Sequence, residues 1–252
     1  MMFPAFPMTR DQIREVDPET PENAGRAFVP FSHGDVIKTV LDGFKKDNLK
    51  PLARRYALSG DKNELSVSMD FDPSIRIKDY LDDYHMSFGF VTSNNRNRSL
   101  TFYCGISAGS YDKVTEKHGM AFSVIHSKKH TSGTDLQLIV LDAVEAWYEQ
   151  CKLVIEQVDE FKRSLLKQKT IDHLLMESCR GPRHHAFKWS KLGLVDEQHR
   201  TDVKEIKART AWSLFVAFAK INRENIPFRQ MDIAVRFRQL LTLTEADKTQ
   251  KI

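Results

Sequence analysis

The sequence of 252 residues has few cysteines and none of the short strings that mark common catalytic or metal sites. Its three cysteines, Cys104, Cys151 and Cys179, are widely spaced and include no Cys-x-x-Cys pair, so neither a disulfide scaffold nor a thiolate zinc site is indicated. The chain also lacks an H-E-x-x-H string, a Walker-type G-x-x-x-x-G-K-[ST] string and a G-x-G-x-x-G string. We therefore expect no metal and no cofactor.

Long apolar runs are missing as well. No stretch approaches the roughly 20 residues of a membrane-spanning helix. The apolar start, residues 1–8, is broken by Pro4 and Pro7 and lacks the basic residues that open a signal peptide. Because 41% of the residues are hydrophobic, the chain can bury a core. We expect a soluble cytoplasmic protein with reduced thiols and no membrane partner.

One string, Gly105-Ile-Ser-Ala-Gly109, fits the G-x-S-x-G pattern of a nucleophilic serine. A nucleophile elbow needs a strand, a sharp turn and a helix. Here the flanks predict an antiparallel strand and a lysine-containing loop. We therefore expect a protein that is not an enzyme, and a hydrolase using Ser107 or Cys104 is the third of three hypotheses.

Hydrophobic periodicity predicts an α+β fold. Ser32 is typical of a helix N-cap, and apolar residues recur at helical spacing from there to about Lys46. Apolar and polar residues then alternate as in half-buried strands. The predicted strands cover residues 53–58, 65–71, 86–90, 100–106 and 120–125. The result is an antiparallel β-meander of about five strands, a count that follows from typical strand lengths.

From residue 134 onward the pattern is helical. A long central helix is expected to about Lys169 with a possible break, followed by a short helix ending near Gly181-Pro182. A loop over 181–201 and helices over 203–222 and 231–241 complete the prediction. The expected domains are an extended proline-rich arm (1–27), an α+β sheet domain (28–133), a helical region packed on the sheet with a basic loop at 180–201 (134–243), and a flexible tail (244–252).

Basic residues concentrate toward the C-terminus. The net charge is +4, but residues 180–238 hold thirteen basic and six acidic residues. Such a concentration is typical of a surface that binds polyanions, and an ordinary solvated helical surface is the alternative. Three basic, partly aromatic segments stand out, at residues 94–98, 126–133 and 180–191.

These segments supply cations for phosphates and flat rings for unpaired bases. The residues expected to contact phosphates are Arg96, Arg98, Lys128, Lys129, Arg180, Arg183, Lys188 and Lys191, and those expected to stack on bases are Tyr103 and Trp189. These aromatic residues could instead have a structural role. Phe187 and Trp189 could fill the core under an exposed loop, and Tyr103 could pack on a face of the sheet.

The order of motifs resembles a phage- and plasmid-borne family, domain of unknown function 932. The resemblance lies in FVPFSHGDVI (28–37), GFVTSNNRNRSL (89–100) and TAWSLFVAF (210–218). Residues 117–120 depart from the family pattern, because they lack a cysteine that the family often carries there. The resemblance implies a role in DNA metabolism, recombination or defence evasion in a bacterial host cell, and its layout is similar in outline to single-strand annealing proteins.

Two further hypotheses follow. The first is a non-catalytic nucleic-acid-binding protein of a phage or mobile element that binds single-stranded DNA, either to anneal it or to support phage transcription or replication. The second is a protein-interaction factor that recruits or inhibits a host protein, such as RNA polymerase or a defence complex. In both, the arm and the long helix could support a homo-oligomer.

Overall fold

The chain forms two compact units, residues 1–152 and 153–252, and each is described by itself. The structure is a computed structural model, and it describes residues 5–7, 9, 12–13, 29–72, 84–95, 98–108, 118–129, 135–180, 186–206, 209–222 and 227–249. Most of the predicted arm therefore lies outside the described residues. The unit boundary falls inside a helix rather than at residue 133, because the two halves of the long central helix pack into different cores.

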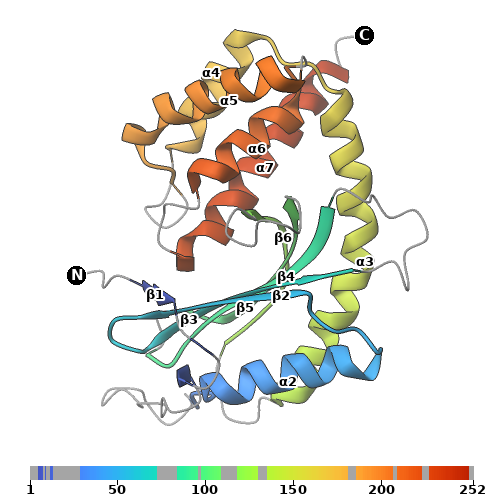
Figure 1. Cartoon of the computed structure of the whole chain (residues 1–252), viewed down its shortest axis with the longest axis vertical. Helices are drawn as coiled ribbons and strands as arrows, with labels where there is room; N and C mark the ends of the chain where they lie inside the picture. Colours follow the sequence, from blue (N-terminus) through green and yellow to red (C-terminus); the bar gives the residue numbers. More distant parts are fainter. Residues whose placement is uncertain are drawn as a thin grey trace. The chain divides into compact units, whose positions relative to one another are not determined.

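The first unit contains a six-stranded antiparallel sheet whose order in space follows the order in sequence (Figure 1). The strands are β1 (Ala5–Pro7), β2 (Ala53–Ser59), β3 (Glu64–Phe71), β4 (Tyr84–Ser93), β5 (Leu100–Ala108) and β6 (His118–Lys128). The five predicted strands are β2 to β6, so the meander is confirmed. The sixth, β1, comes from the arm, where three residues are too few for a periodic signal.

Two helices cover one face of this sheet (Figure 1). They are α2 (His33–Lys46), and the first part of α3 (Leu136–Arg163). The predicted N-cap of α2 is confirmed, since Ser32 Oγ accepts a 3.0 Å hydrogen bond from the Asp35 amide. Gly43 lies where α2 faces α3, and a Cβ atom there would make ordinary van der Waals contact, 3.5 Å from the side chains of both Val140 and Val144.

An aromatic cluster forms the core between the helices and the sheet. The Phe44 ring of α2 lies 4.2 Å from Phe71, 5.0 Å from Phe88 and 5.2 Å from Trp147, measured between ring centroids. All four side chains are fully buried. Edge-to-face aromatic contacts of this kind stabilise a core beyond simple area burial.

The opposite face of the sheet is polar and also buried. Ser66 and Ser87 are 5% exposed and Asp70 is 0% exposed. The strict alternation predicted solvent on this face, and that part of the prediction is wrong. Hydrogen bonds to one carboxylate oxygen offset part of the cost of this burial: Asp70 Oδ1 accepts from Arg55 Nη2 and from Ser87 Oγ, each at 2.7 Å. The other oxygen, Oδ2, has no hydrogen-bond partner among the described residues.

The second unit is helical. It contains the end of α3, α4 (Gln168–Ser178), a short 3-10 turn (Trp189–Lys191), α5 (Leu192–Ile206), α6 (Ala211–Asn222) and α7 (Pro227–Thr249). Stacked rings fill its core, with Phe218 and Phe237 centroids 3.7 Å apart and nearly parallel. Among the described residues, no helix is both long enough and apolar enough to cross a membrane.

Three helix boundaries differ from prediction in this unit. Residues 192–201 were predicted as loop but belong to α5, and the predicted single helix over 203–222 is two helices. The division has a local cause, because Thr210 caps α6: its amide donates to Ser213 Oγ at 3.0 Å and its Oγ1 accepts from the Ser213 amide at 3.1 Å. The last helix continues past Thr244 to Thr249, where a frayed tail was predicted.

Candidate nucleic-acid interface

Strand register brings two of the three basic segments to one end of the sheet. In the β5–β6 pairing, Leu100 lies opposite Lys128 and Thr101 opposite Ser127. The hydroxyls of Thr101 and Ser127 are hydrogen-bonded at 3.0 Å. The turn after β4 therefore lies beside the end of β6, although about 30 residues separate the two segments in sequence.

The hairpin turn between β2 and β3 reaches the same end. The Asn94 amide donates a 2.8 Å hydrogen bond to the Asn63 carbonyl, which joins the two turns. Lys62 in that turn is exposed and has a φ of 60°. We call Lys62, Arg98, Lys128 and Lys129 together the basic sheet end. Two carboxylates, Asp61 and Glu64, lie in the same region.

Ser93 fixes the backbone of the turn that carries Arg98. Ser93 Oγ accepts a 2.9 Å hydrogen bond from the Arg98 amide and donates a 3.1 Å bond to the Arg98 carbonyl. Ser93 is fully buried, so these bonds are protected from water. The position of the Arg98 backbone is therefore set by the end of β4, before any ligand arrives.

Arg98 itself is engaged by an acid. Its Nε atom lies 3.6 Å from Glu64 Oε2, and the two side chains are 18% and 17% exposed. Arg98 was expected to be available for phosphate, whereas it is half-buried in an ion pair. Arg96, the other predicted cation of this turn, lies outside the described residues.

Lys128 and Lys129 are both exposed. Within the described ranges, no carboxylate lies at ion-pair distance from either of them. Both amines are therefore accessible to a polyanion. The neighbouring His126 packs its ring 6.3 Å from that of Phe102, so it belongs to the sheet more than to the surface.

The predicted stacking residue of the first unit is not accessible. Tyr103 lies on β5 and is only 2% exposed. A base could not reach its ring without displacing protein, so the structural interpretation of Tyr103 holds and the stacking prediction is wrong. Periodicity did not decide between the two interpretations of Tyr103, because this residue lies on the polar face, which in a half-buried strand is exposed to solvent.

The third basic segment belongs to the second unit. Arg180 is exposed and pairs with Glu177, and its carbonyl accepts a hydrogen bond from Arg236. Lys188 is exposed and Lys191 is half-buried at the end of the 3-10 turn. Phe187 is 2% exposed and packs against Phe218 with ring centroids 4.6 Å apart and planes tilted by 43°, so the structural interpretation of Phe187 as a core residue is confirmed. Arg183 and the side chain of Trp189 lie outside the described residues.

The catalytic alternatives find little support in the geometry. Ser107 lies inside β5 rather than at a strand–turn–helix elbow, and its buried Oγ has no hydrogen-bond partner among the residues that the structure describes. Cys104 is fully buried and contacts Cys151, whose pKa is raised mainly by burial and further by Cys104. Because the Cys104 thiol is fully buried, a substrate could not reach it without displacing protein.

A serine–histidine contact in the second unit has a structural explanation. His199 Nε2 lies 3.1 Å from Ser213 Oγ, and both residues are buried. Ser213 belongs to the capping box of α6, and its Oγ also donates to the Thr210 carbonyl at 2.9 Å. In the part of the chain that the structure describes, no three His, Cys, Asp or Glu side chains gather as metal ligands would.

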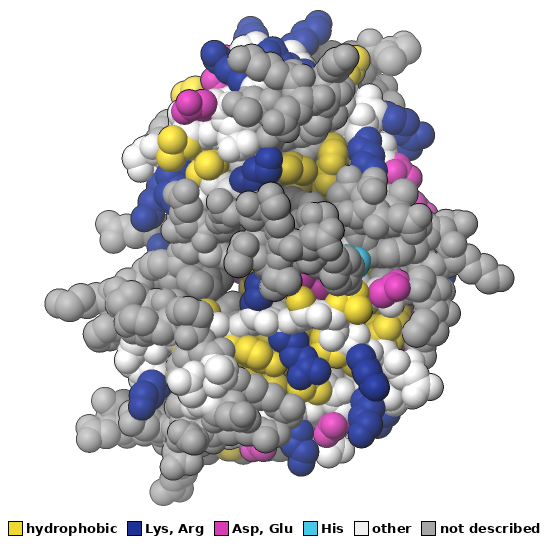
Figure 2. All heavy atoms as spheres, in the orientation of Figure 1, with side chains coloured by type: hydrophobic (Ala, Val, Ile, Leu, Met, Phe, Trp, Pro, Cys, Tyr) yellow, Lys and Arg dark blue, Asp and Glu magenta, His cyan; other side chains and the backbone are white. Residues whose placement is uncertain are grey.

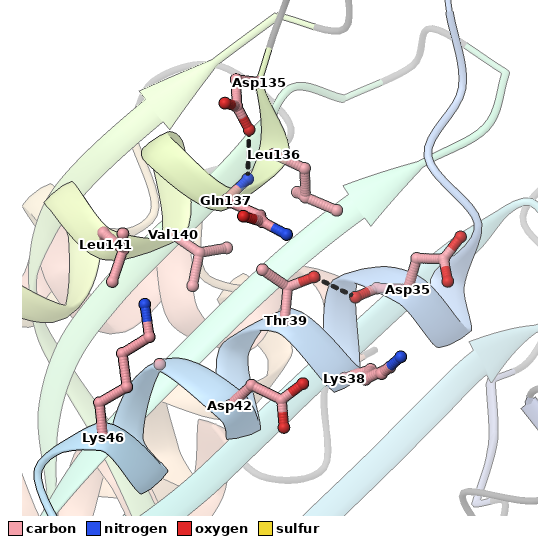
Figure 3. A pocket seen from close by; sticks show the side chains of 11 residues that line it. Asp35, Lys38, Thr39, Asp42, Lys46, Asp135, Leu136, Gln137, Val140 and Leu141 are labelled. Atoms are coloured by element: carbon pink, nitrogen blue, oxygen red, sulfur yellow. Dashed lines mark hydrogen bonds between the residues drawn. The ribbon is translucent and has the colours of Figure 1, made fainter.

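A cavity of about 630 Å³ lies between α2 and the start of α3 (Figure 3). Its charged lining consists of three aspartates and two lysines, Asp35, Asp42, Asp135, Lys38 and Lys46. Asp135 is already used, since its carboxylate caps α3 by accepting from the Gln137 amide at 2.8 Å. With more acids than bases, this cavity is unfavourable for a phosphate backbone.

Charge alone does not mark an interface. Figure 2 shows Lys and Arg side chains scattered over the face in view, interrupted by apolar and acidic side chains and by residues that the structure does not describe. What distinguishes the basic sheet end is the register that brings separate segments together.

Comparison with protein-family models, with curated proteins and with solved structures gave no match. The resemblance to a phage-borne family therefore stays a prediction.

Proposed function

We propose that this protein binds single-stranded DNA without catalysing a reaction, and that the basic sheet end contacts the phosphate backbone. The observation that supports this most is the pairing of Leu100 with Lys128, which brings the Arg98 turn beside two accessible lysines. Neither segment alone carries enough cations to bind a polyanion well, and together they form one positively charged edge.

The width of the basic sheet end suits a nucleic-acid backbone. Neighbouring strands lie about 4.8 Å apart, so the distance from β3 to β6 is roughly 14 Å. Loops across that span carry Lys62, Arg98, Lys128 and Lys129, against Asp61 and Glu64. A backbone crossing the strand ends would meet several cations in succession, and each phosphate neutralised releases counterions.

The buried Tyr103 changes the expected energetics. Without that stacking ring, phosphate contacts carry most of the affinity, so binding should weaken steeply with salt. For single strands, log K falls with log salt by about 0.7 for each phosphate neutralised. Sequence preference should be weak, because phosphates carry no base information.

Fluorescence anisotropy with a labelled oligonucleotide tests this proposal. The full chain is titrated with single-stranded DNA, duplex DNA and a heparin competitor at several salt concentrations. The double variant Lys128→Glu/Lys129→Glu should bind single-stranded DNA at least about tenfold more weakly, since like charges then face the phosphates.

The matched control is Lys50→Glu/Lys152→Glu. These two lysines are also exposed, and Lys50 precedes β2 at the opposite end of the sheet. Both variants change the net charge equally, so the control should keep nearly normal affinity. Equal losses in the two variants, or no binding by the unmodified chain at low salt, would refute the proposal.

The second candidate function, protein interaction, is favoured by two exposed leucines. Leu138 and Leu141 on α3 are 58% and 38% exposed, and Leu141 lines the cavity between α2 and α3. A nuclease-treated pull-down from bacterial lysate should recover a partner that the variant Leu138→Ser/Leu141→Ser loses. If nuclease removes every partner, captured proteins were bridged by nucleic acid and this candidate fails.

A further inference from the structure

We propose that the cavity between α2 and the start of α3 is the contact surface of a symmetric homodimer, so that its occupant is a second copy of this chain. This inference is independent of the proposed nucleic-acid function. The observation that carries it is the order of charges on the wall that α2 contributes to the cavity. These side chains, which we call the α2 stripe, alternate between negative and positive in sequence order: Asp35, Lys38, Asp42 and Lys46.

The members of the α2 stripe share one face of the helix. They are spaced three or four residues apart, and all four side chains are exposed beside the cavity (Figure 3). Opposite charges at this spacing can pair within a helix. In the described part of the chain, however, none of the four forms an ion pair. The charges of the α2 stripe are therefore available to a partner.

The α2 stripe is complementary to itself when two copies meet with their α2 helices antiparallel. In a twofold dimer the same surface of each copy meets the other, and an axis crossing α2 near residue 40 would place Lys38 of each copy opposite Asp42 of the other. The same axis brings Asp35 of each copy close to Lys46 of the other, because their positions match to within about one residue, or 1.5 Å along the helix. Parallel helices would instead set each charge against its own kind, which repels the two copies.

The same charges disfavour other occupants. The cavity lining holds three aspartates and two lysines, so a strongly basic or a strongly acidic partner would meet repulsion from part of the wall. A second copy meets an opposite charge at each position of the α2 stripe. The charge pattern therefore favours self-association over binding of a partner with one dominant charge.

Apolar side chains next to the α2 stripe supply surface that a dimer can bury. Leu141 lines the cavity and is 38% exposed, and Leu138, about one turn earlier on α3, is 58% exposed. A dimer would cover these side chains in both copies. Apolar burial then provides affinity, while the charges fix the orientation of the two copies.

Two charge-reversal variants of the full chain, Lys38→Glu and Asp42→Lys, test this arrangement. Sedimentation velocity is measured from about 1 to 100 μM after nuclease treatment, and the unmodified chain should pass from monomer to dimer. Each variant alone should dimerise at least about tenfold more weakly, because like charges then meet on both sides of the axis. An equimolar mixture of the two variants should regain nearly the unmodified affinity, since the reversed charge of one chain then faces the reversed charge of the other.

The matched control is Lys152→Glu, which changes the net charge by the same amount as Lys38→Glu. Lys152 is exposed on α3 but lies further along the helix, outside the cavity lining. This control should dimerise within about twofold of the unmodified chain, because only general electrostatics change. Regained affinity in the mixture also shows that both variants are folded.

The mixture separates a second copy from any other occupant, because no other partner would restore binding when the two variants meet. The inference is overturned if the unmodified chain stays monomeric throughout, if Lys38→Glu and Lys152→Glu dimerise equally well, or if the mixture regains nothing. DNA binding by a chain that stays monomeric overturns this inference alone. Dimerisation of a chain that does not bind DNA overturns the proposed function alone.

Discussion

Trp147 Nε1 donates a 3.0 Å hydrogen bond to the main-chain carbonyl of Ser87, and this bond joins α3 to the centre of the sheet. The indole is fully buried, with ring centroids 5.2 Å from Phe44 and 5.4 Å from Phe71. A buried indole needs a partner for its N–H, and here the partner is backbone that cannot move away. The bond therefore fixes the helix against the strands more firmly than apolar packing alone.

Replacing Trp147 with Phe should destabilise the protein by about 2–4 kcal/mol. The change removes the hydrogen bond and leaves a cavity beside Phe44. Urea unfolding followed by circular dichroism measures the difference. Leu138→Ala on the same helix is the control, because Leu138 is 58% exposed and should cost about 0.5 kcal/mol or less. Similar losses from both changes would contradict this account of the core.

Asp70→Leu should cost about 3 kcal/mol, because it leaves Arg55 and Ser87 without their buried acceptor. Asp70 is fully buried and its Oδ1 lies 2.7 Å from Arg55 Nη2. Arg55 is 37% exposed, which lets water relieve part of the loss. The double variant Arg55→Met/Asp70→Leu should regain part of the stability in chemical denaturation. If the double variant is less stable than Asp70→Leu alone, the loss of stability does not come from the hydrogen bonds between Asp70 and Arg55.

Stability should fall as the pH drops below neutrality because of His33. Burial lowers the pKa of His33 below its ordinary value of 6.5, and a hydrogen bond to the Lys62 carbonyl opposes that effect in part. A lowered pKa means that the unfolded chain binds more protons, so the contribution of His33 is present above about pH 6.5 and is lost as pH falls toward the folded-state pKa.

The variant His33→Gln isolates this effect, since glutamine can still reach the Lys62 carbonyl but does not titrate. Thermal or urea unfolding between about pH 7.5 and pH 5 should show a shallower decline in the variant than in the unmodified chain. Parallel declines would assign the pH dependence to other groups.

Ser93→Ala should weaken DNA binding by about threefold to tenfold. It removes both hydrogen bonds that hold the Arg98 backbone, at 2.9 and 3.1 Å, and so loosens the turn before binding. Anisotropy measures the affinity, and the free energy of unfolding is measured alongside it. Ser66→Ala is the control, because Ser66 is also buried but lies within β3, away from the turn. Unchanged affinity in Ser93→Ala would show that the turn needs no such support.

Most of the secondary structure follows from local patterns. Ser32 marks the start of a helix, and the apolar spacing that follows it shows which side of that helix is apolar. The alternation over residues 65–71 gives the same information for a strand. Both signals lie within one segment of the chain. The division between α5 and α6 was missed because Thr210 and Ser213 form a capping box inside an apparently continuous helical pattern. The sequence contains the pattern Thr-x-x-Ser, but this pattern is common and does not by itself indicate the start of a helix. Only the tertiary structure shows that α6 begins there.

The sequence by itself determined the α+β class, the sequential meander and the presence of three basic segments. Only the tertiary structure decided that Lys128 lies beside the Arg98 turn, that Glu64 pairs with Arg98, and that Asp70 and Tyr103 are buried. The physical reason is that periodicity gives the apolar side of a strand but not its register. Register depends on backbone hydrogen bonds between distant segments, and it determines which loops, charges and rings finally meet.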